Sequence, residues 1–223
     1  MSKPIVIYGA GPFARLMHYY FSADSDYTVM AFTVDCDYFT SPLFCGLPVV
    51  PAERLIAEYP PATFQMFIAV GYKDMRARQA VFERGKAAGY RMINYISSRA
   101  VCFPDLRIGE NNAIMAQVQI EPFVTIGDNN VFWSDTLVAH DVSVGNGNYF
   151  GAKCVLGGLS TVENSCFLGN GTVLINGITI HNETHALPGT ILLQNTKPFF
   201  QYLGNPAREI GSHKETGIII NRG

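Results

Sequence analysis

The sequence predicts two domains, an α/β Rossmann-like domain followed by an all-β domain in which a six-residue repeat winds into a parallel β-helix. The first prediction rests on a strand, a glycine-rich turn and a helix at the start of the chain. The second rests on apolar residues at every sixth position from about residue 106 to 193. The composition, 48% hydrophobic and 15% charged, is typical of a folded protein.

The N-terminal turn is the first element with a functional implication. Residues 4–9 (PIVIYG) form a short apolar run that predicts a buried strand, and residues 15–21 can continue as a helix. Between them lies the segment Gly9-Ala10-Gly11-Pro12-Phe13-Ala14, and Pro12 suits the first turn of a helix. Backbone N–H groups at such a helix start can bind an anion. A tight turn without a ligand stays open, because this glycine pattern alone is weakly specific.

The next segments alternate between strands and helices. A strand at 27–34 ends at Asp35, roughly where Rossmann-like folds place an acidic contact to ribose. Four strands in about 100 residues suit a mononucleotide better than a whole dinucleotide. The other expected elements are a helix at 51–59, a strand at 64–70, a helix at 74–88 and a strand at 91–96.

The second half of the chain repeats every six residues. Neither the helical period of 3.6 nor the strand period of 2 explains this spacing, whereas a coil with three flat sides does, with one short strand per side. An ordinary β-sandwich with chance periodicity is the alternative. Twelve of the fifteen repeat positions are Ile, Val or Leu, two are Phe and one is Ala: Ile108, Ile114, Ile120, Ile126, Phe132, Val138, Val144, Phe150, Leu156, Val162, Leu168, Leu174, Ile180, Ala186 and Leu192.

Polar corners show the same period independently. Segments running from Gly109 to Asn112, from Gly127 to Asn130 and from Gly145 to Asn148 recur 18 residues apart, which is three hexapeptides or one full coil. Gly and Asn tolerate positive φ, so we expect these residues to form tight corners.

The repeat resembles that of the hexapeptide-repeat acyltransferases. With a Rossmann-like domain in front, the chain is similar to the bacterial family of sialic-acid O-acetyltransferases and nucleotide-amino-sugar N-acetyltransferases. The resemblance covers residue 3 to about residue 210. Further matching stretches are AFTVD at 31–35, GLPV at 46–49, FIAVG at 67–71 with Arg76, and GNPAR at 204–208.

The resemblance implies a left-handed β-helix that forms a homotrimer with active sites between subunits. It implies a nucleotide-sugar-binding domain at 1–98 and an acyltransferase domain at 99–210, while the tail at 211–223 has no interpretation. Phe13 stands where members that bind UDP-sugars often have His, so UDP, GDP and dTDP all remain open. The family's Gly-rich turn and acidic residue make the predicted substrate-binding residues Gly9, Ala10, Gly11, Pro12, Phe13, Asp35 and Gly71.

His140 is the predicted catalytic residue. It lies at a corner of the coil and is followed by Asp141. An imidazole titrates near neutral pH and can take a proton from an attacking amine. The family match gives His140 the role of general base, with Asp141 orienting the ring; a surface corner histidine is the alternative. His181 and His185 are expected to cap outer corners.

The resemblance also implies acetyl-CoA as co-substrate and no metal. In the family the pantetheine arm follows the coils C-terminal to the catalytic histidine, and Gly158 would present its N–H to the thioester carbonyl. The predicted cofactor-binding residues are Tyr149, Gly158, Asn170, Pro188, Gly189, Pro206 and Arg208.

The expected function is N-acetylation of a nucleotide-linked 4-amino-4,6-dideoxysugar for surface glycan synthesis, such as that of lipopolysaccharide O-antigen. O-acetylation of sialic acid or of another sugar hydroxyl is the alternative within the class. From other classes, two alternatives remain. One is a zinc hydratase of the γ-carbonic-anhydrase type that uses His140, His181 and His185, and the other is a non-catalytic scaffold.

The composition disfavours several other classes. The net charge is −2 and no basic run occurs, which argues against nucleic-acid binding. With no signal-peptide pattern and no apolar run of spanning length, we expect a cytoplasmic protein off the membrane. The five cysteines lack C-x-x-C spacing and are expected to be reduced, although a nucleophilic one stays open. The low charge favours a surface covered by homo-oligomerisation.

Overall fold

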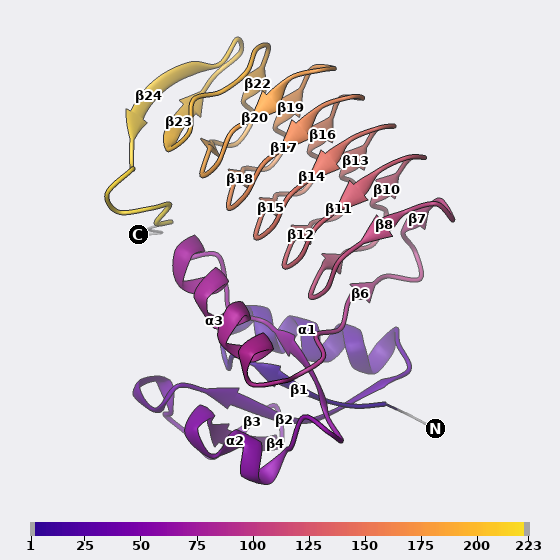
Figure 1. Ribbon diagram of the computed structural model, residues 1–223, viewed down its shortest axis with the longest axis vertical. Coiled ribbons are helices and arrows are strands. Elements are labelled where there is room, and N and C mark those ends of the chain that lie inside the picture. Colours follow the sequence, from indigo (N-terminus) through magenta and orange to yellow (C-terminus); the bar gives the residue numbers. More distant parts are fainter. Residues whose placement is uncertain (1–2, 221–223) are drawn as a thin grey trace. The chain divides into compact units, whose positions relative to one another are not determined.

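The computed structural model describes residues 3–220, which form two compact units. The first consists of residues up to Gly71 together with Ala80–Tyr95, and the second of Tyr72–Gln79 together with the residues from Ile96 onward. The boundaries therefore fall in the loop after Gly71, inside the helix Met75–Ala87 and within the short strand Tyr95–Ile96 (Figure 1).

The first unit is built on a twisted sheet of five strands in the order β3-β4-β2-β1-β5. Strands β4, β2, β1 and β5 are parallel, and β3 joins β4 through an antiparallel hairpin. The hairpin turn consists of Cys45 and Gly46, which both have positive φ, as a two-residue type I′ turn requires. The strands are β1 (Lys3–Tyr8), β2 (Tyr27–Val34), β3 (Leu43–Phe44), β4 (Leu47–Pro51) and β5 (Gln65–Ile68).

Helix α1 follows the predicted pattern closely. Gly11 is its extended N-cap, Pro12 its first residue, and the buried residues Ala14, Met17 and Phe21 repeat at helical spacing. The strand expected at 91–96 is wrong for the most part, since only a bridge at Met92 and the last two residues pair. The helices are α1 (Pro12–Ala23), the 3₁₀ turn η1 (Cys36–Tyr38), α2 (Ala52–Glu58) and α3 (Met75–Ala87).

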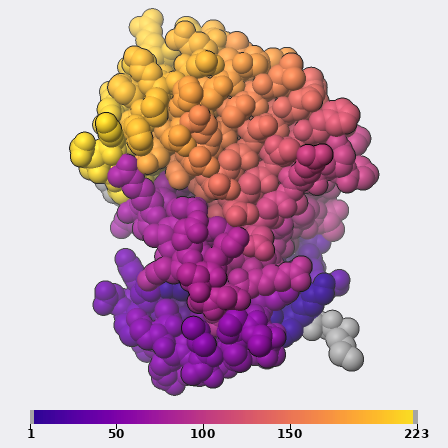
Figure 2. Space-filling view, viewed as in Figure 1, coloured from indigo at the N-terminus to yellow at the C-terminus, as the bar shows by residue number. Residues whose placement is uncertain are grey.

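The second unit is a three-sided parallel coil, drawn in Figure 1 as stacked two-residue strands. Paired residues are 18 positions apart, as in Leu137 with Val155. In the space-filling view the coils follow one another as bands from magenta to yellow (Figure 2). The strands are β6 (Tyr95–Ile96), β7 (Val101–Cys102), β8 (Arg107–Ile108), β9 (Ala113–Ile114), β10 (Gln119–Ile120), β11 (Thr125–Ile126), β12 (Val131–Phe132), β13 (Leu137–Val138), β14 (Ser143–Val144), β15 (Tyr149–Phe150), β16 (Val155–Leu156), β17 (Thr161–Val162), β18 (Phe167–Leu168), β19 (Val173–Leu174), β20 (Thr179–Ile180), β21 (His185–Ala186), β22 (Ile191–Leu192), β23 (Phe200–Leu203) and β24 (Arg208–Ser212).

All fifteen predicted repeat positions are the second residues of strands β8 to β22. Most of their side chains are fully buried and together form one continuous core. The side carrying β13 has the order β22-β19-β16-β13-β10-β7, and the side carrying β14 has the order β20-β17-β14-β11-β8. The third side begins at β6 and ends in β23 and the antiparallel edge strand β24.

As predicted, the positive-φ residues of the three corner segments are Asn or Gly, namely Asn111, Asn129 and Gly147. The left-handed position is the third residue after each core residue, for example Asn111 at 56° and Asp141 at 59°. Gly109 and Gly127 serve another purpose. A Cβ on Gly109 would lie 2.9 Å from the carbonyl oxygen of Gly127, so glycine is needed there for close approach of backbones in adjacent coils.

The three corner asparagines form a buried ladder inside the coil. Asn112, Asn130 and Asn148 have no exposed surface. The Oδ1 atom of Asn112 accepts from the N–H of Asn130, the Oδ1 atom of Asn130 accepts from the N–H of Asn148, and the latter's Oδ1 accepts from the N–H of Cys166. Each amide also donates to a backbone carbonyl, so these buried polar groups are satisfied.

Residues Tyr72–Gln79 pack on one corner of the coil through a buried arginine. Arg78 is 1% exposed and donates from Nη2 to the carbonyl of Asn129 at 2.6 Å and from Nη1 to that of Gly147 at 3.2 Å. Among residues 3–220 no carboxylate pairs with it. Burial lowers the pKa of Arg78 to about 10, which still leaves it charged at neutral pH.

Candidate active site

His140 lies on the corner between β13 and β14. Its Nδ1 is 2.9 Å from Oδ2 of Asp141, the left-handed residue of that corner. The side chains of His140 and Asp141 are 52% and 45% exposed, so the pair is open to a ligand. A carboxylate beside Nδ1 favours the tautomer with the proton on Nδ1, which leaves Nε2 as a free base.

Gly158 lies directly against the imidazole, one coil further on. A Cβ at position 158 would be 2.9 Å from both Cε1 and Nε2 of His140, so only glycine accommodates the ring in this position. The N–H of Leu159 donates to the carbonyl of His140 at 3.1 Å, which ties the two corners together. Among residues 3–220, the N–H of Gly158 donates to no acceptor of the chain.

Exposed apolar side chains flank this corner along the same edge of the coil. An exposed apolar group of this extent is typical of an interaction surface. Its members, with their exposed fractions, are Phe123 (69%), Leu159 (63%), Ile175 (40%) and Leu193 (49%).

The structure does not bring the other predicted cofactor residues to His140 within one chain. Asn170, Pro188 and Gly189 lie on the corner that follows the β15, β18 and β21 side, where Asn170 Oδ1 caps the N–H of Ala152. Pro206 precedes the exposed strand β24, in which Arg208 is the first residue.

Tyr149 is a different case, because its side chain is buried. It is 7% exposed and stacks on Phe167 at 4.9 Å between ring centroids, with Tyr72 packed against both. A contact of Tyr149 with the cofactor therefore stays a prediction, and in this chain only its backbone could make it.

The remaining histidines do not converge on His140. His181 lies at a corner, as predicted, with Nδ1 3.1 Å from Glu163. For His185 the prediction of a corner cap is wrong, since it lies in β21 with its ring against Phe167, and burial lowers its pKa to about 4. Among residues 3–220, no group of three His, Cys, Asp or Glu side chains is placed to hold a metal ion.

The predicted nucleotide-binding residues follow the carboxyl ends of β1, β2 and β5. Strand β1 lies between the other two, and the chain order reverses there, which is where open α/β sheets bind ligands. Gly9 has φ of 127°, and a Cβ on it would lie 2.8 Å from the carbonyl oxygen of Ala69. Gly11 and Gly71 are open on their Cα side, which leaves space for a ligand against the backbone. Ala10, Pro12 and Phe13 complete this turn.

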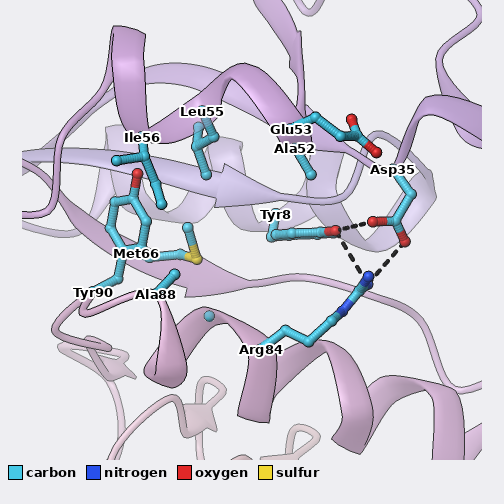
Figure 3. A pocket seen from close by; sticks show the side chains of 11 residues that line it. Tyr8, Asp35, Ala52, Glu53, Leu55, Ile56, Met66, Arg84, Ala88 and Tyr90 are labelled. Atoms are coloured by element: carbon cyan, nitrogen blue, oxygen red, sulfur yellow. Dashed lines mark hydrogen bonds and ion pairs between the residues drawn. The ribbon is translucent and has the colours of Figure 1, made fainter.

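Asp35 is held in a polar cluster at the same edge of the sheet (Figure 3). Tyr8 donates from its hydroxyl to Oδ1 at 2.5 Å, and Arg84 donates from Nη2 to Oδ2 at 2.9 Å. The bond from Arg84 and then that from Tyr8 lower the pKa of Asp35, despite partial burial. The pKa of Tyr8 is raised by burial and by this bond, so its hydroxyl stays protonated.

A groove of about 250 Å³ opens beside this cluster, between α2 and α3. In Figure 3 the polar groups lie at one end, and Ile56, Met66 and Tyr90 lie at the other. The lining thus combines apolar walls with a few convergent polar groups, as small-molecule sites do. The lining residues are Tyr8, Asp35, Ala52, Glu53, Leu55, Ile56, Met66, Arg84, Gly85, Ala88 and Tyr90.

Sequence reasoning missed Tyr8, Arg84 and Glu121. Tyr8 ends a strand and Arg84 lies on a helix, and no motif distinguishes either from a structural residue. Glu121 Oε2 accepts from the backbone N–H of His140 at 2.9 Å. Its spacing of 19 residues from His140, one coil plus one, was the only available signal.

Replacing Arg84 by Ala is expected to raise the pKa of Asp35 toward the ordinary carboxyl value of about 3.9, because the largest cause of its depression is lost. The ion pair stabilises the fold while Asp35 is ionised, and this contribution is lost as the pH falls through the lowered pKa. A ¹³C NMR titration of the Asp35 carboxyl measures the shift. Arg54→Ala, which breaks an exposed pair with Glu58, is the control. An unchanged Asp35 titration in Arg84→Ala would contradict the assignment.

Comparisons with known proteins agree with both units. Residues 4–84 match the family model of the PglD N-terminal domain, and residues 105–139 match that of the bacterial transferase hexapeptide (six repeats). A comparison with curated protein sequences finds no match. Among the described residues, no helix is long and apolar enough to cross a membrane.

Three solved structures share the fold over nearly their whole length. PerB from Caulobacter crescentus, solved with CoA and GDP-perosamine, is 28% identical with a TM-score of 0.84, covering 95% of this chain and 98% of PerB. The acetyltransferase domain of PglB from Neisseria gonorrhoeae FA1090 is 20% identical with a TM-score of 0.83, covering 94% and 100%. WeeI from Acinetobacter baumannii AYE is 19% identical with a TM-score of 0.66, covering 93% and 100%. The last two establish similarity of fold alone.

The coil, its histidine corner and the two family matches define an acyltransferase of the hexapeptide-repeat class. Within that class, the chain is similar to the N-acetyltransferase PerB, and a match to the PglD N-terminal domain precedes its hexapeptide repeat.

Proposed function

We propose that the protein transfers an acetyl group from acetyl-CoA to the amino group of a nucleotide-linked 4-amino-4,6-dideoxysugar. The observation that carries the proposal is the His140–Asp141 pair, with Nε2 unoccupied beside Gly158. The relative PerB, described as a GDP-perosamine N-acetyltransferase, supports the class of substrate. Structures of that enzyme with one histidine replaced by Ala or Asn, each bound to CoA and GDP-perosamine, fit a central histidine.

The residues of the corner account for both proton movements. The bound co-substrate supplies an acetyl thioester. Nε2 of His140 takes a proton from the sugar amine as its nitrogen bonds to the acyl carbon, and Asp141 stabilises the imidazolium that forms. The Gly158 N–H is placed to donate to the carbonyl oxygen as it gains charge. His140 then returns its proton to the sulfur that leaves, so the base is regenerated.

Nucleotide binding would use the carboxyl edge of the first unit. Gly11 and the start of α1 offer backbone N–H groups to the diphosphate, whereas the N–H of Gly9 donates to the carbonyl of Thr33. Asp35 is ionised, and each carboxylate oxygen can accept a bond from a ribose or base donor in addition to those from Tyr8 and Arg84. The groove beside it suits an aromatic base.

We expect the active form to be a homotrimer, because Phe123, Leu159 and Leu193 would otherwise leave apolar surface in water beside the catalytic corner. Tyr149 would contribute to the cofactor site through its backbone, since its side chain is buried. Asn170, Pro188, Gly189, Pro206 and Arg208 lie on other edges of the chain, so they can join that site only across a subunit interface. A role in surface glycan synthesis, such as that of lipopolysaccharide O-antigen, in the cytoplasm would follow from the substrate.

The decisive experiment incubates the purified chain with acetyl-CoA and UDP-, GDP- and dTDP-linked 4-amino-4,6-dideoxysugars. Thiol release with at least one of them, and an N-acetyl product by mass spectrometry, is the expected result. Thiol release only with sialic acid would indicate O-acetylation instead. Absence of thiol release with every acceptor would refute the proposal.

A further inference from the structure

Corners on one edge of the coil, those after β8, β11 and β14, share one way of satisfying a backbone donor. The residue two positions after the core residue has its N–H capped by the side chain one coil later. Glu110 is capped by Asp128, Asp128 by Asn146, and Asn146 by Asn164, at 2.7, 2.7 and 2.9 Å. A short polar side chain in the following coil therefore fixes each of these corners in the coil before it.

The last corner of this edge, at Asn182, and the His140 corner on another edge do not use this device. The position one coil after Asn182 is Phe200, which lies in β23, and the position one coil after His140 is Gly158, which has no side chain. At both corners the backbone N–H donates instead to a glutamate of the preceding coil, 19 residues earlier in the sequence. Glu163 Oε2 accepts from the N–H of Asn182 at 2.8 Å, and Glu121 Oε2 accepts from the N–H of His140 at 2.9 Å.

Because Gly158 has no side chain, the following coil offers the N–H of His140 no side-chain acceptor. A side chain at 158 would collide with the ring, so the corner must be held from the other side. Asp141 fixes the ring through Nδ1, but it lies on the same corner and moves with it. Glu121 is the side chain that ties the backbone of His140 to the neighbouring coil.

We propose that Glu121 is a positioning residue for His140, holding the catalytic corner at the distance from Gly158 that acyl transfer requires. The inference rests on the proposed function, in which His140 is the base. A purely structural role of this bond can be measured separately, because Glu163 makes the same bond at a corner without a catalytic side chain.

The test compares four variants of the full-length protein: Glu121→Ala, Glu121→Gln, Glu163→Ala and Glu163→Gln. Glu121→Ala is expected to lower kcat about tenfold to hundredfold with both KM values unchanged, because small misplacements of a catalytic group have effects of this size. Glu121→Gln keeps an acceptor oxygen and should remain within about threefold of wild type. Both Ala variants should lose similar thermal stability, whereas Glu163→Ala should keep its kcat.

An NMR readout makes the test independent of turnover. The imidazole resonances of His140 should shift or broaden in Glu121→Ala and stay unchanged in Glu163→Ala. Equal kcat values and unchanged His140 resonances in both Ala variants would overturn the inference, as would failure of Glu121→Gln to restore activity. Full activity of His140→Ala, by contrast, would refute the proposed function itself.

Discussion

His140→Ala is expected to lower kcat by about 10³-fold while leaving KM for both substrates within a few-fold. General base catalysis by a positioned histidine contributes about 10²–10⁴-fold, and the side chain is half exposed, so its removal does not open a cavity. Thiol release from acetyl-CoA under saturating acceptor measures the loss. Circular dichroism and the melting temperature should match those of wild type.

His181→Ala is the matched control for this substitution. His181 also pairs with a carboxylate through Nδ1, at 3.1 Å from Glu163, but it lies on another corner of the coil. Its removal should leave kcat unchanged. If both variants retain wild-type turnover, the base is not a histidine of these corners and the proposed mechanism is wrong.

Arg78→Ala is expected to lower the free energy of unfolding by about 3 kcal/mol. The substitution leaves the carbonyls of Asn129 and Gly147 without their buried donors, at about 1–3 kcal/mol each, and opens a cavity. Relief from burying the guanidinium offsets part of this loss. For a chain of this length the melting temperature should fall by about 6–12 °C, measurable by calorimetry.

Arg54→Ala is the control that shows how much stability is lost when an exposed arginine is removed. Arg54 pairs with Glu58 on the surface of α2, and its side chain is 69% exposed. Exposed i, i+4 pairs contribute about 0.3–0.5 kcal/mol, so the melting temperature should hardly change. A wild-type melting temperature for Arg78→Ala would show that the two carbonyls find other donors, and would contradict the anchoring role.

The fold could be predicted from the sequence to different degrees in the two units. Every core position from Ile108 to Leu192 could be read from its period, because each strand is local and repeats one coil later. The hairpin at Cys45 and Gly46 could not, since its strands are too short to show a pattern. The close approach of the Gly109 backbone to the next coil could not be predicted either, because nothing in the sequence around Gly109 indicates that contact.

In the candidate site too, contacts between neighbours in the sequence could be predicted and contacts between distant residues could not. His140 and Asp141 are adjacent in sequence, so their pairing could be anticipated. The contact of Arg84 with Asp35 joins residues 49 positions apart on a helix and a loop, and no period relates them. The burial of the Tyr149 side chain could not be predicted either, because the segment that packs on it begins at Tyr72, far away in the sequence.

Because the coils stack without interruption, equivalent positions along the edge that carries His140 are evenly spaced. Residues 140, 158, 176 and 194 occupy equivalent places, each separated from the next by one strand spacing of about 4.8 Å. A thioester arm bound along this edge would therefore contact equivalent positions at intervals of one coil, and no inserted loop changes that spacing. The length of the arm that fits could therefore change in evolution only by gain or loss of a whole coil of 18 residues, which would leave His140 in place.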